Sequence, residues 1–413
     1  MNITNFSTRS YILFLVTFSL VSSPQLIHGQ KIKQKIIKGI LYSDKAPVEI
    51  IISNGKISEI VRLEKDDKTP EIYIAPGLID IQINGYMGVD FGNPDLDIND
   101  LHKVVKSLWK EGVTTFLPTL TSADHEKLIK CFTSLSRAFD DPDISPSIPG
   151  FHLEGPYISP VKGFRGAHLE KYIRPPDWEE FLQYQKAARN KILLVTVAPE
   201  IDGAIPFIRK CTESGIIISL GHHNGTAEII RQATDAGARM STHLGNGCAN
   251  MINRHLNPLW PQLADSRLTP TLIVDGYHLT REEVQVFYKV KGPDYTILVS
   301  DALNLAGLEP GEYIRDGRKV ILTPNVVRFP AENVLAGAAS PISSCVGNIM
   351  RFTQCNLRQA IDMASANPAR MFNLDLGEIS TGKRADLILF TIEEGELIIQ
   401  QTIVAGKVVY SRN

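Results

Sequence analysis

The sequence lacks a surplus of charge of either sign, which limits the partners that it can attract. Its 413 residues carry 43 Lys and Arg against 45 Asp and Glu, a formal net charge of -2. A protein that binds nucleic acid or an anionic membrane electrostatically needs a strongly basic surface, and this composition gives no sign of one. An anionic small-molecule substrate would have to be held by a few individually placed cations.

Clustered cysteines are also missing. No Cys-x-x-Cys pair occurs, which argues against a zinc-cysteine cluster or a dense disulfide framework. We expect the cysteines to be small buried apolar residues, with at least one unpaired because their number is odd. They are Cys131, Cys211, Cys248, Cys345 and Cys355.

A third absence is the dinucleotide fingerprint Gly-x-Gly-x-x-Gly, so an open dinucleotide-binding sheet is disfavoured. Internal repeats are absent as well. The middle of the chain instead contains eight apolar runs of strand length, several of them separated by helix-like segments. This alternation predicts a parallel sheet covered by helices, and its length and number of units predict a (β/α)8 barrel. The runs are GLIDIQING, VTTFLPTL, PGFHLEGP, ILLVTVAPE, IIISLGHH, RMSTHLGNG, TLIVDGYH and TILVSDA.

The two ends of the chain differ from this middle. Short β-rich runs separated by turn residues occur near the start, such as VEIIISNGKISEIV, and near the end, such as ADLILFTIEEGELIIQ. They predict one small β-sandwich domain assembled from both ends. The expected boundaries are 31–75 and 378–413 for this domain and 76–377 for the barrel.

The first residues have the order of a secretory signal peptide. One arginine precedes the apolar run YILFLVTFSLVSS, and PQLIHGQ and a basic segment follow, which predicts a signal over 1–30 with cleavage near Gly29 or Gln30. The run is too short to predict a stable membrane span. We therefore expect an exported protein, periplasmic or secreted. The alternatives are an uncleaved anchor, or a start assigned too far upstream and a cytoplasmic protein.

Barrel enzymes build their sites from the C-terminal ends of the strands. The first strand lacks the His-x-His pair that many metal-dependent hydrolases carry there, and its inward positions hold Gln82 and Asn84, which are poor metal ligands. Later strand ends supply Glu154, His222 and His243. A carboxylate and two imidazoles on separate strands can converge on one ion, as a catalytic metal site requires.

Two other histidines compete for these positions. His152 shares the parity of Glu154, and only one of His222 and His223 can point into the barrel because successive strand residues face opposite sides. Each candidate also has a structural interpretation. A lone glutamate at a strand end often binds backbone amides, and a lone histidine is more often a core residue than a ligand, so both interpretations stay open.

Asp301 ends the last strand-like run, in LVSDALNLAG, and is the candidate for proton transfer. A metal nearby would lower the pKa of a bound water toward roughly 7 and polarise a carbonyl. Asp301 could then carry the water's proton to a leaving amine. The structural alternative is a carboxylate that caps the following helix.

Polar residues in the loops beyond the strand ends are candidates for contacts with a substrate. His168 lies in KGFRGAHLE and His278 in DGYHLT. Arg254, in NMINRH, is a candidate clamp for phosphate or carboxylate, although a solvated loop arginine explains it equally well. Asn246, in HLGNG, either binds substrate or stabilises a turn.

Several motifs occur together and in order, and their order is specific although no single motif is. The set resembles the N-acetylglucosamine-6-phosphate deacetylases of the amidohydrolase superfamily, over essentially everything after the signal segment. The resemblance implies a deformed (β/α)8 barrel with a small β-sandwich, usually as a dimer. It also implies hydrolysis of the acetamide of an amino-sugar phosphate to acetate and free amine. The motifs are PGLIDIQINGYMGVDF, GVTTFLPTLTS, FHLEGPYIS, KGFRGAH, VTVAPE, SLGHHNGT, STHLGNG, VDGYHL, LVSDA, LAGAA and NPARMFNL.

By this resemblance, Glu154, His222 and His243 are the ligands of one divalent metal ion, and Asp301 is the catalytic acid and base. Zinc is expected first, with iron and manganese as alternatives, since two histidines and a carboxylate suit several metals. The missing His-x-His predicts a single ion on the third, fifth and sixth strands. Gln82 and Asn84 are then polar filler or supporting partners.

The same resemblance implies contacts with the sugar, phosphate or acetyl group. They are expected from His168, Asn246, Gly247 and His278, while Arg254 matches an arginine that reaches phosphate across a subunit interface. The partners expected are therefore an amino-sugar substrate and a second copy of the chain, without nucleic acid and without stable membrane insertion.

Some motifs depart from the family pattern. The family commonly has THLYNAM where this chain has THLGNGC, GHSNA where it has GHHNG, and TDATAPAG where it has SDALNLAG. These changes spare the expected ligands and Asp301 but leave the sugar open. Export favours a second hypothesis, a deacetylase for an unphosphorylated N-acyl sugar or a related N-acyl compound. A barrel that only binds sugar is a third.

Overall fold

The computed structural model describes residues 34–64, 71–315, 317–331 and 334–412. From Gln34 onward the chain forms one compact unit. The predicted signal peptide, 1–30, lies outside the described residues. Export and the domain boundaries therefore stay predictions.

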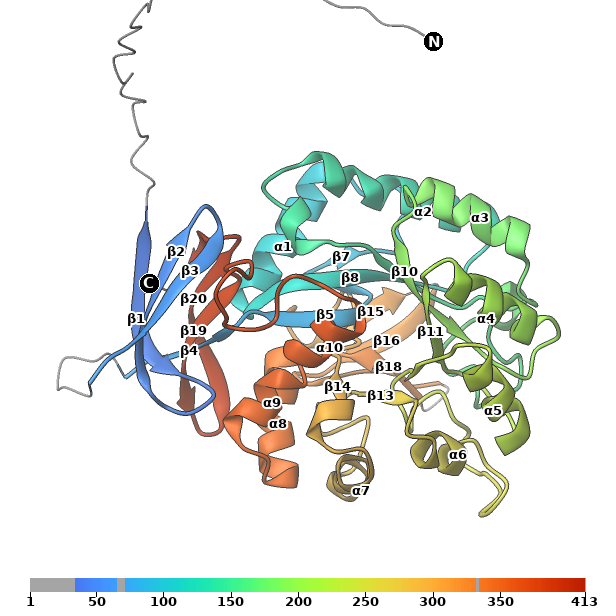
Figure 1. Ribbon diagram of the computed structural model, residues 1–413. Helices are drawn as coiled ribbons and strands as arrows, with labels where there is room; N and C mark the ends of the chain where they lie inside the picture. Colours follow the sequence, from blue (N-terminus) through green and yellow to red (C-terminus); the bar gives the residue numbers. More distant parts are fainter. Residues whose placement is uncertain (1–33, 65–70, 316, 332–333, 413) are drawn as a thin grey trace, which may run out of the picture. The chain divides into compact units, whose positions relative to one another are not determined.

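Eight parallel strands form the barrel that the apolar runs predict (Figure 1). Each strand pairs with the next one of the eight along the chain. The first strand of the eight meets the segment that follows the last strand. There Asp301 N–H donates to Gln82 O (2.9 Å) and Asn84 N–H donates to Ala302 O (2.8 Å). These two bonds put the ends of the first and last strands side by side. The strands are β5 (Leu78–Ile83), β8 (Val113–Thr121), β9 (Phe151–Glu154), β10 (Ile192–Val197), β11 (Ile217–Leu220), β12 (Met240–Ser241), β13 (Thr269–Leu272) and β14 (Ile297–Leu298).

Amphipathic helices alternate with these strands, as the runs predict. In α1 the buried residues recur at i, i+3, i+4 and i+7 from Leu101, which turns one apolar face to the core. Asp97 begins this helix, and its carboxylate accepts from the N–H groups of Asn99 and Asp100. The helices are α1 (Ile98–Lys110), α2 (His125–Leu135), α3 (Trp178–Ala187), α4 (Ala204–Glu213), α5 (Ala227–Asp235), α6 (Leu259–Ala264), α7 (Arg281–Lys291), α8 (Ile342–Thr353), α9 (Leu357–Asp362) and α10 (Ala366–Met371), with 3-10 turns η1 (Ser136–Asp140), η2 (Ser145–Ser147), η3 (Glu170–Tyr172) and η4 (Pro293–Tyr295).

Strands from both ends of the chain form a second, seven-stranded mixed sheet, which confirms that the two ends build one β-rich part. Its order is β21-β20-β19-β4-β1-β2-β3, and the two ends meet where β4 pairs antiparallel with β19. Figure 1 shows the blue and red strands side by side. The strands are β1 (Lys35–Leu41), β2 (Pro47–Ser53), β3 (Lys56–Arg62), β4 (Tyr73–Pro76), β19 (Leu387–Glu393), β20 (Glu396–Val404) and β21 (Lys407–Ser411).

A four-stranded antiparallel sheet follows Asp301, and none of the eight apolar runs predicts it. It has a small apolar core of its own, in which Val320, Val327 and Phe329 are buried. The stacking of the Arg318 guanidinium over the Phe329 ring, 3.8 Å from its centroid, adds to this core. Its strands are β15 (Gly311–Arg315), β16 (Arg318–Leu322), β17 (Val326–Phe329) and β18 (Val334–Ala338). A separate two-stranded hairpin earlier in the chain joins β6 (Gly85–Tyr86) to β7 (Val89–Asp90).

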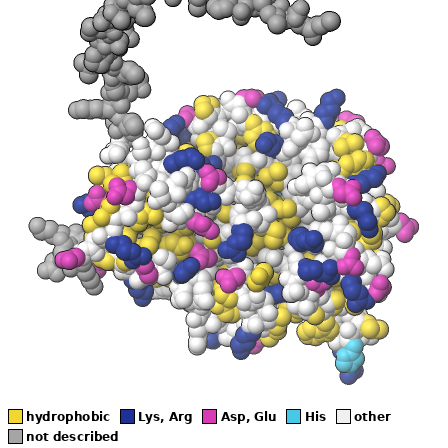
Figure 2. All heavy atoms as spheres, viewed as in Figure 1, with side chains coloured by type: hydrophobic (Ala, Val, Ile, Leu, Met, Phe, Trp, Pro, Cys, Tyr) yellow, Lys and Arg dark blue, Asp and Glu magenta, His cyan; other side chains and the backbone are white. Residues whose placement is uncertain are grey.

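The distribution of surface charge and the state of the cysteines agree with what the amino-acid composition predicts. Figure 2 shows basic and acidic side chains interspersed on one face, without a field of a single sign. All five cysteines are unpaired; four are buried and Cys248 is half-buried. In the part of the chain that the structure describes, helices are too short or too polar to cross a membrane.

Candidate active site

The candidate ligands gather where the barrel strands end, as predicted for this fold. Glu154 is the last residue of β9, while His222 and His243 each lie two residues beyond the end of their strands, β11 and β12. All three side chains are buried. Both histidines and Asp301 have positive φ angles (52°, 30° and 50°), which is uncommon for residues other than glycine. Such strained backbone concentrates at functional sites.

One carboxylate oxygen joins the two histidines. Glu154 Oε1 lies 3.1 Å from His222 Nε2 and 3.0 Å from His243 Nε2, and the two imidazole rings are nearly perpendicular, at 89°. Burial alone would raise the pKa of Glu154, but the hydrogen bonds from both histidines hold it well below its usual range. The carboxylate is therefore charged, as a metal ligand must be.

The tautomer of His222 indicates that a cation belongs here. Its Nδ1 lies 3.0 Å from the carbonyl oxygen of Phe164, which can only accept, so Nδ1 carries the ring proton. Nε2 then either carries a second proton or turns a lone pair toward the Glu154 carboxylate. Glu154, His222 and His243 would hold a divalent cation, which would accept these lone pairs and balance the negative charge. The donor set thus fits one divalent ion.

Two glycines from different loops enclose the His222 ring. A Cβ atom on Gly247 would lie 2.8 Å from His222 Nδ1, and one on Gly166 would lie 2.8 Å from His222 Cε1. Both glycines have positive φ angles, 61° and 56°. Glycine at both positions therefore lets the two loops close on the ring and fix its orientation.

His168 lies beside this group, and its ligand atom, with those of Glu154 and His222, forms a set within 4.8 Å of one another. The geometry nevertheless suits a substrate contact better. Ser122 donates to His168 Nδ1 from its backbone N–H (3.4 Å), and its hydroxyl lies 2.9 Å away, so Nδ1 is an acceptor and the proton sits on Nε2. Burial lowers the pKa of His168 to about 3, so the ring is neutral. It can donate a hydrogen bond but offers no lone pair to a metal.

Asp301 lies at the seam that closes the barrel. Its Oδ1 accepts hydrogen bonds from Asn84 Nδ2 (2.8 Å) and Gln82 Nε2 (3.3 Å), so the two residues that replace His-x-His bind Asp301. Burial, with the charge of Glu154, raises the pKa of Asp301 to about 6. A carboxyl group in this range can both accept and return a proton near neutral pH.

The remaining candidates fall into different settings. His278 Nδ1 lies 2.7 Å from Asp275 Oδ2, which fixes its ring. Asn246 donates its backbone N–H to His243 O (2.8 Å), which places it beside a candidate ligand, and its Nδ2 has no hydrogen-bond partner among the described residues. Arg254 is exposed on the loop beyond Asn246, and the structure does not bring it to the ligands.

The rival histidines have other partners. His152 Nε2 lies 2.8 Å from Thr196 Oγ1 inside the barrel, and His223 Nδ1 accepts from Gly225 N–H (3.2 Å). Sequence reasoning missed Ser122 and Gly166, which lie in loops without periodic patterning. It also missed Asp80, a buried carboxyl on β5 that accepts from Ser300 N–H (3.2 Å).

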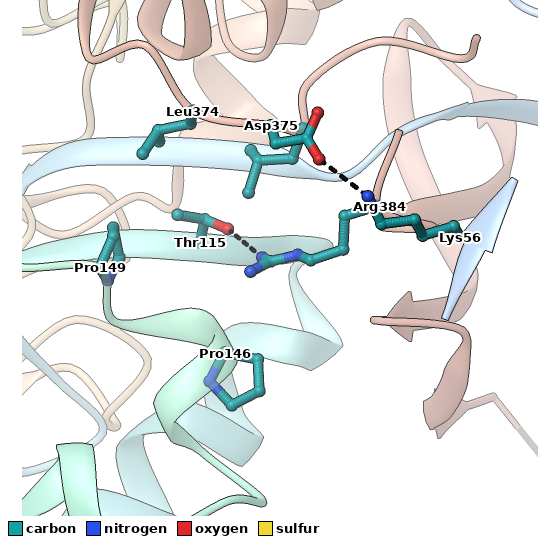
Figure 3. Close-up of a pocket in the computed structure, with 8 residues that line it drawn as sticks. Lys56, Thr115, Pro146, Pro149, Leu374, Asp375 and Arg384 are labelled. Carbon is teal, nitrogen blue, oxygen red and sulfur yellow. Dashed lines mark hydrogen bonds and ion pairs between the residues drawn. The ribbon is translucent and has the colours of Figure 1, made fainter. Parts of the chain in front are cut away.

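A larger hollow of about 190 Å³ lies far from this chemistry, at the starts of barrel strands β8 and β9 (Figure 3). Arg384 crosses it and donates to Thr115 Oγ1 (3.2 Å) and, by way of Nε, to Asp386 (3.0 Å). Lys56 and Asp375 pair at its rim (3.3 Å). Its charged groups are paired with one another, so the hollow is a junction between the terminal sheet and the barrel.

Fold and site together define a metal-dependent hydrolase of the amidohydrolase type, and residues 73–409 match the model of the Amidohydrolase family. The chain is 31% identical over 349 residues to the N-acetylglucosamine-6-phosphate deacetylase of Mus musculus (82% of this chain, 83% of the relative). It is 29% identical over 371 residues to that of Lysinibacillus sphaericus (87% and 93%).

Solved structures give the same result. The deacetylase of that name from Thermotoga maritima has a TM-score of 0.81 and 31% identity, over 92% of this chain and all of that one. A variant from Mycobacterium smegmatis, in complex with N-acetyl-D-glucosamine-6-phosphate, has a TM-score of 0.81 and 25% identity, over 91% of this chain and 100% of that one. The chain belongs to the N-acetylglucosamine-6-phosphate deacetylase family, and it is a hydrolase that acts on an amide bond.

Proposed function

We propose that the protein removes the acetyl group from N-acetylglucosamine 6-phosphate and gives acetate and the free amine. The observation that carries this proposal is the convergence of Glu154, His222 and His243 on one point, with Asp301 held at the neighbouring seam. In a member of this family, that arrangement supplies both a metal site and a group for proton transfer.

Glu154, His222 and His243 would hold one divalent ion, and zinc is the metal that we propose. When bound, the ion polarises the acyl oxygen and lowers the pKa of the attacking water. Metal analysis of the purified protein tests both the number and the kind of ion. About one zinc per chain is expected, and a ratio near two would contradict the single site.

Asp301 accepts a proton as the water oxygen attacks the acetyl carbon. It then delivers a proton to the amide nitrogen as the C–N bond breaks, so that acetate and the amine separate. The neutral His168 donates a hydrogen bond from Nε2 to the acyl oxygen and stabilises the charge that develops there. Replacing Asp301 with Asn should abolish turnover, and an active Asp301→Asn variant would contradict this assignment.

Selectivity for the sugar is assigned to the surrounding loops. Asn246 offers its Nδ2 hydrogens to a sugar or phosphate oxygen, and His278, whose Nδ1–H donates to Asp275, offers the lone pair of Nε2 to a sugar hydroxyl. We propose that Arg254 binds the phosphate of a substrate in a second copy of the chain. The loop that carries it and the start of α6 expose three large apolar residues, as a subunit interface would: Met251 (90% exposed), Leu256 (85%) and Trp260 (52%).

Acetate release from N-acetylglucosamine with and without the 6-phosphate tests the substrate. A charged hydrogen bond contributes roughly 1.5–3 kcal/mol, so kcat/KM should favour the phosphate by about tenfold or more. Replacing Arg254 with Met should remove this preference, and sedimentation should show a dimer. Equal rates on both sugars would contradict the proposal.

We also propose that the chain is exported by the segment 1–30, for which the order of its residues is the support. Export would bring the enzyme into contact with unphosphorylated N-acetylated sugars, and turnover of these alone would favour the second hypothesis. N-terminal sequencing of the mature protein tests export directly. A start at Met1 in the cytoplasm would contradict it.

A further inference from the structure

Two amide side chains on the first barrel strand bind the group that carries the proton. Asn84 Nδ2 donates to Asp301 Oδ1 at 2.8 Å, and Gln82 Nε2 donates to the same oxygen at 3.3 Å. Backbone bonds between the same segments, Asp301 N–H to Gln82 O and Asn84 N–H to Ala302 O, hold them in register. The side-chain contacts therefore follow from the way in which the barrel closes.

The two oxygens of Asp301 are thereby made different. Oδ1 receives both amide donors, whereas Oδ2 receives no hydrogen bond from the residues that the structure describes. An N–H bond to one carboxylate oxygen fixes the plane of the group and leaves the second oxygen to exchange protons. An amide side chain is neutral at every ordinary pH, so it provides this orientation without adding a charge beside Glu154.

The unfavourable burial of one end of the Asn84 side chain supports a functional role for this residue. Its Oδ1 is buried and has no hydrogen-bond partner among the described residues, an arrangement that lowers stability. A side chain kept only for stability would be expected to use both of its ends. Here the amide nitrogen binds Asp301 while the oxygen has no partner among the described residues, so the bond to Asp301 is the contact that the residue contributes to this site.

We propose that Asn84 and Gln82 are positioning residues, which hold Asp301 so that Oδ1 is anchored and Oδ2 carries the proton during amide hydrolysis. This inference rests on the proposed function, because it assigns Asp301 to proton transfer. Asn84 is the main contributor, since its bond is the shorter one. The hydrogen bonds that these two side chains donate go to Asp301 and not to Glu154, His222 or His243, so we expect metal binding to be independent of both residues.

The experiment compares the metal-loaded full-length enzyme with Asn84→Ala, Asn84→Asp and Gln82→Ala, with acetate release as the measurement. Loss of such a partner typically costs 10–100-fold, so kcat of Asn84→Ala should fall by about this factor while KM changes by less than about threefold. Asn84→Asp has the same size but no donor, and its kcat should fall at least as far. Gln82→Ala should lose less.

Asn304→Ala is the matched control. Asn304 also has an amide side chain and follows Asp301 by three residues, but its Oδ1 accepts a hydrogen bond from Arg315 (3.2 Å), and it makes no hydrogen bond to Asp301. It should keep nearly the kcat of the unmodified enzyme. The Asn84 variants should bind as much metal as the unmodified enzyme, and they should remain folded at the assay temperature even where their melting temperature shifts. This readout separates positioning from a general loss of structure.

Two results would overturn the inference while leaving the proposed function intact. One is an Asn84→Ala variant with unchanged kcat, and the other is a variant whose lost activity follows lost metal or lost folding. If the unmodified enzyme releases no acetate from any N-acetylated sugar, it is the proposed function that fails. The two failures are therefore distinguishable.

Discussion

At the scale of the residue, the site depends on side chains whose backbone is strained. His222, His243 and Asp301 all have positive φ angles, and each follows a short buried strand. Such a conformation costs of order 1–3 kcal/mol and persists only where the surroundings impose it. For His222 the surroundings are the two glycines that enclose its ring, Gly166 and Gly247. Glycines without a reactive side chain thus determine where this candidate metal ligand points.

Replacing Gly247 with Ala should weaken metal binding. The new Cβ would lie 2.8 Å from His222 Nδ1, and the positive φ angle disfavours alanine as well. We expect the affinity for zinc to fall by at least about tenfold, measured by competition with a chelating dye. Gly215→Ala is the control, because Gly215 has a similar φ of 78° with nothing within 4 Å of its Cβ position. Equal zinc affinity of Gly247→Ala and the control would contradict the enclosure of His222.

Asp80 should make stability depend on pH. Burial raises its pKa to about 7, against roughly 4 in the unfolded chain. Between these values the folded state keeps a proton that the unfolded state has lost, so the free energy of unfolding falls as pH rises through this window. The slope is at most roughly 1.4 kcal/mol per pH unit. Denaturation at about pH 5 and about pH 7 should show this fall, and Asp80→Asn should lack it. If the free energy of unfolding fell equally with pH in the unmodified protein and in Asp80→Asn, Asp80 would not be the cause of the pH dependence.

At the scale of the element, most barrel strands are short, and pairing with their neighbours holds them in position. Strands of two to six residues, such as β12 and β5, end in a polar residue or a turn, and their parallel pairing brings those ends to one edge. Several of the helices that surround the barrel begin where side chains hydrogen-bond to the first N–H groups of the helix. In α1 the capping carboxylate of Asp97 and the returning side chain of Asp100 satisfy N–H groups that otherwise lack partners.

Removing the cap of α1 should reduce stability without changing activity. Asp97→Ala loses the two hydrogen bonds that Asp97 Oδ1 accepts from the N–H groups of Asn99 and Asp100, and it should lower the free energy of unfolding. Chemical denaturation measures this. The exposed Asp95 lies two residues earlier and does not cap the helix, so Asp95→Ala should have almost no effect. Equal losses in both variants would mean that the cap contributes little.

Much of the architecture could be predicted from sequence because it depends on local patterns. The eight apolar runs are all barrel strands, and the polar residue at the end of each run locates Glu154, His243 and Asp301 at one edge. The sheet of β15–β18 could not be predicted, since its strands are half-exposed and carry mixed charges. The partners of Gln82 and Asn84 were equally out of reach, because their bond to Asp301 exists only after the first and last strands meet.

At the scale of the whole molecule, the terminal sheet and the barrel are joined by charged groups at the hollow in Figure 3. Asp386 is buried, and its carboxylate accepts from Arg384 and from Ala405 N–H (2.7 Å). Arg384 also reaches Thr115 at the start of a barrel strand. One guanidinium therefore connects the C-terminal part of the chain with the barrel.

Replacing Arg384 with Met should destabilise the protein, because it leaves the buried Asp386 without its charged partner. We expect a loss of about 2 kcal/mol, below the roughly 3–5 kcal/mol of a fully enclosed pair because Arg384 is partly exposed. Lys56→Met is the control, since the Lys56–Asp375 pair is 58% and 64% exposed and should contribute little. Thermal unfolding measures both. Equal effects would contradict a special role for Arg384.

The closing seam of the barrel also has a consequence for the order in which the protein becomes active. Glu154, His222 and His243 all precede Asp301 along the chain, and the last strand must dock before Asp301 meets Gln82 and Asn84. A growing or partly assembled chain can gather the proposed metal ligands earlier than it can position Asp301, the proposed proton carrier. We therefore expect deacetylase activity to appear late in folding, after the first and last strands of the barrel have paired.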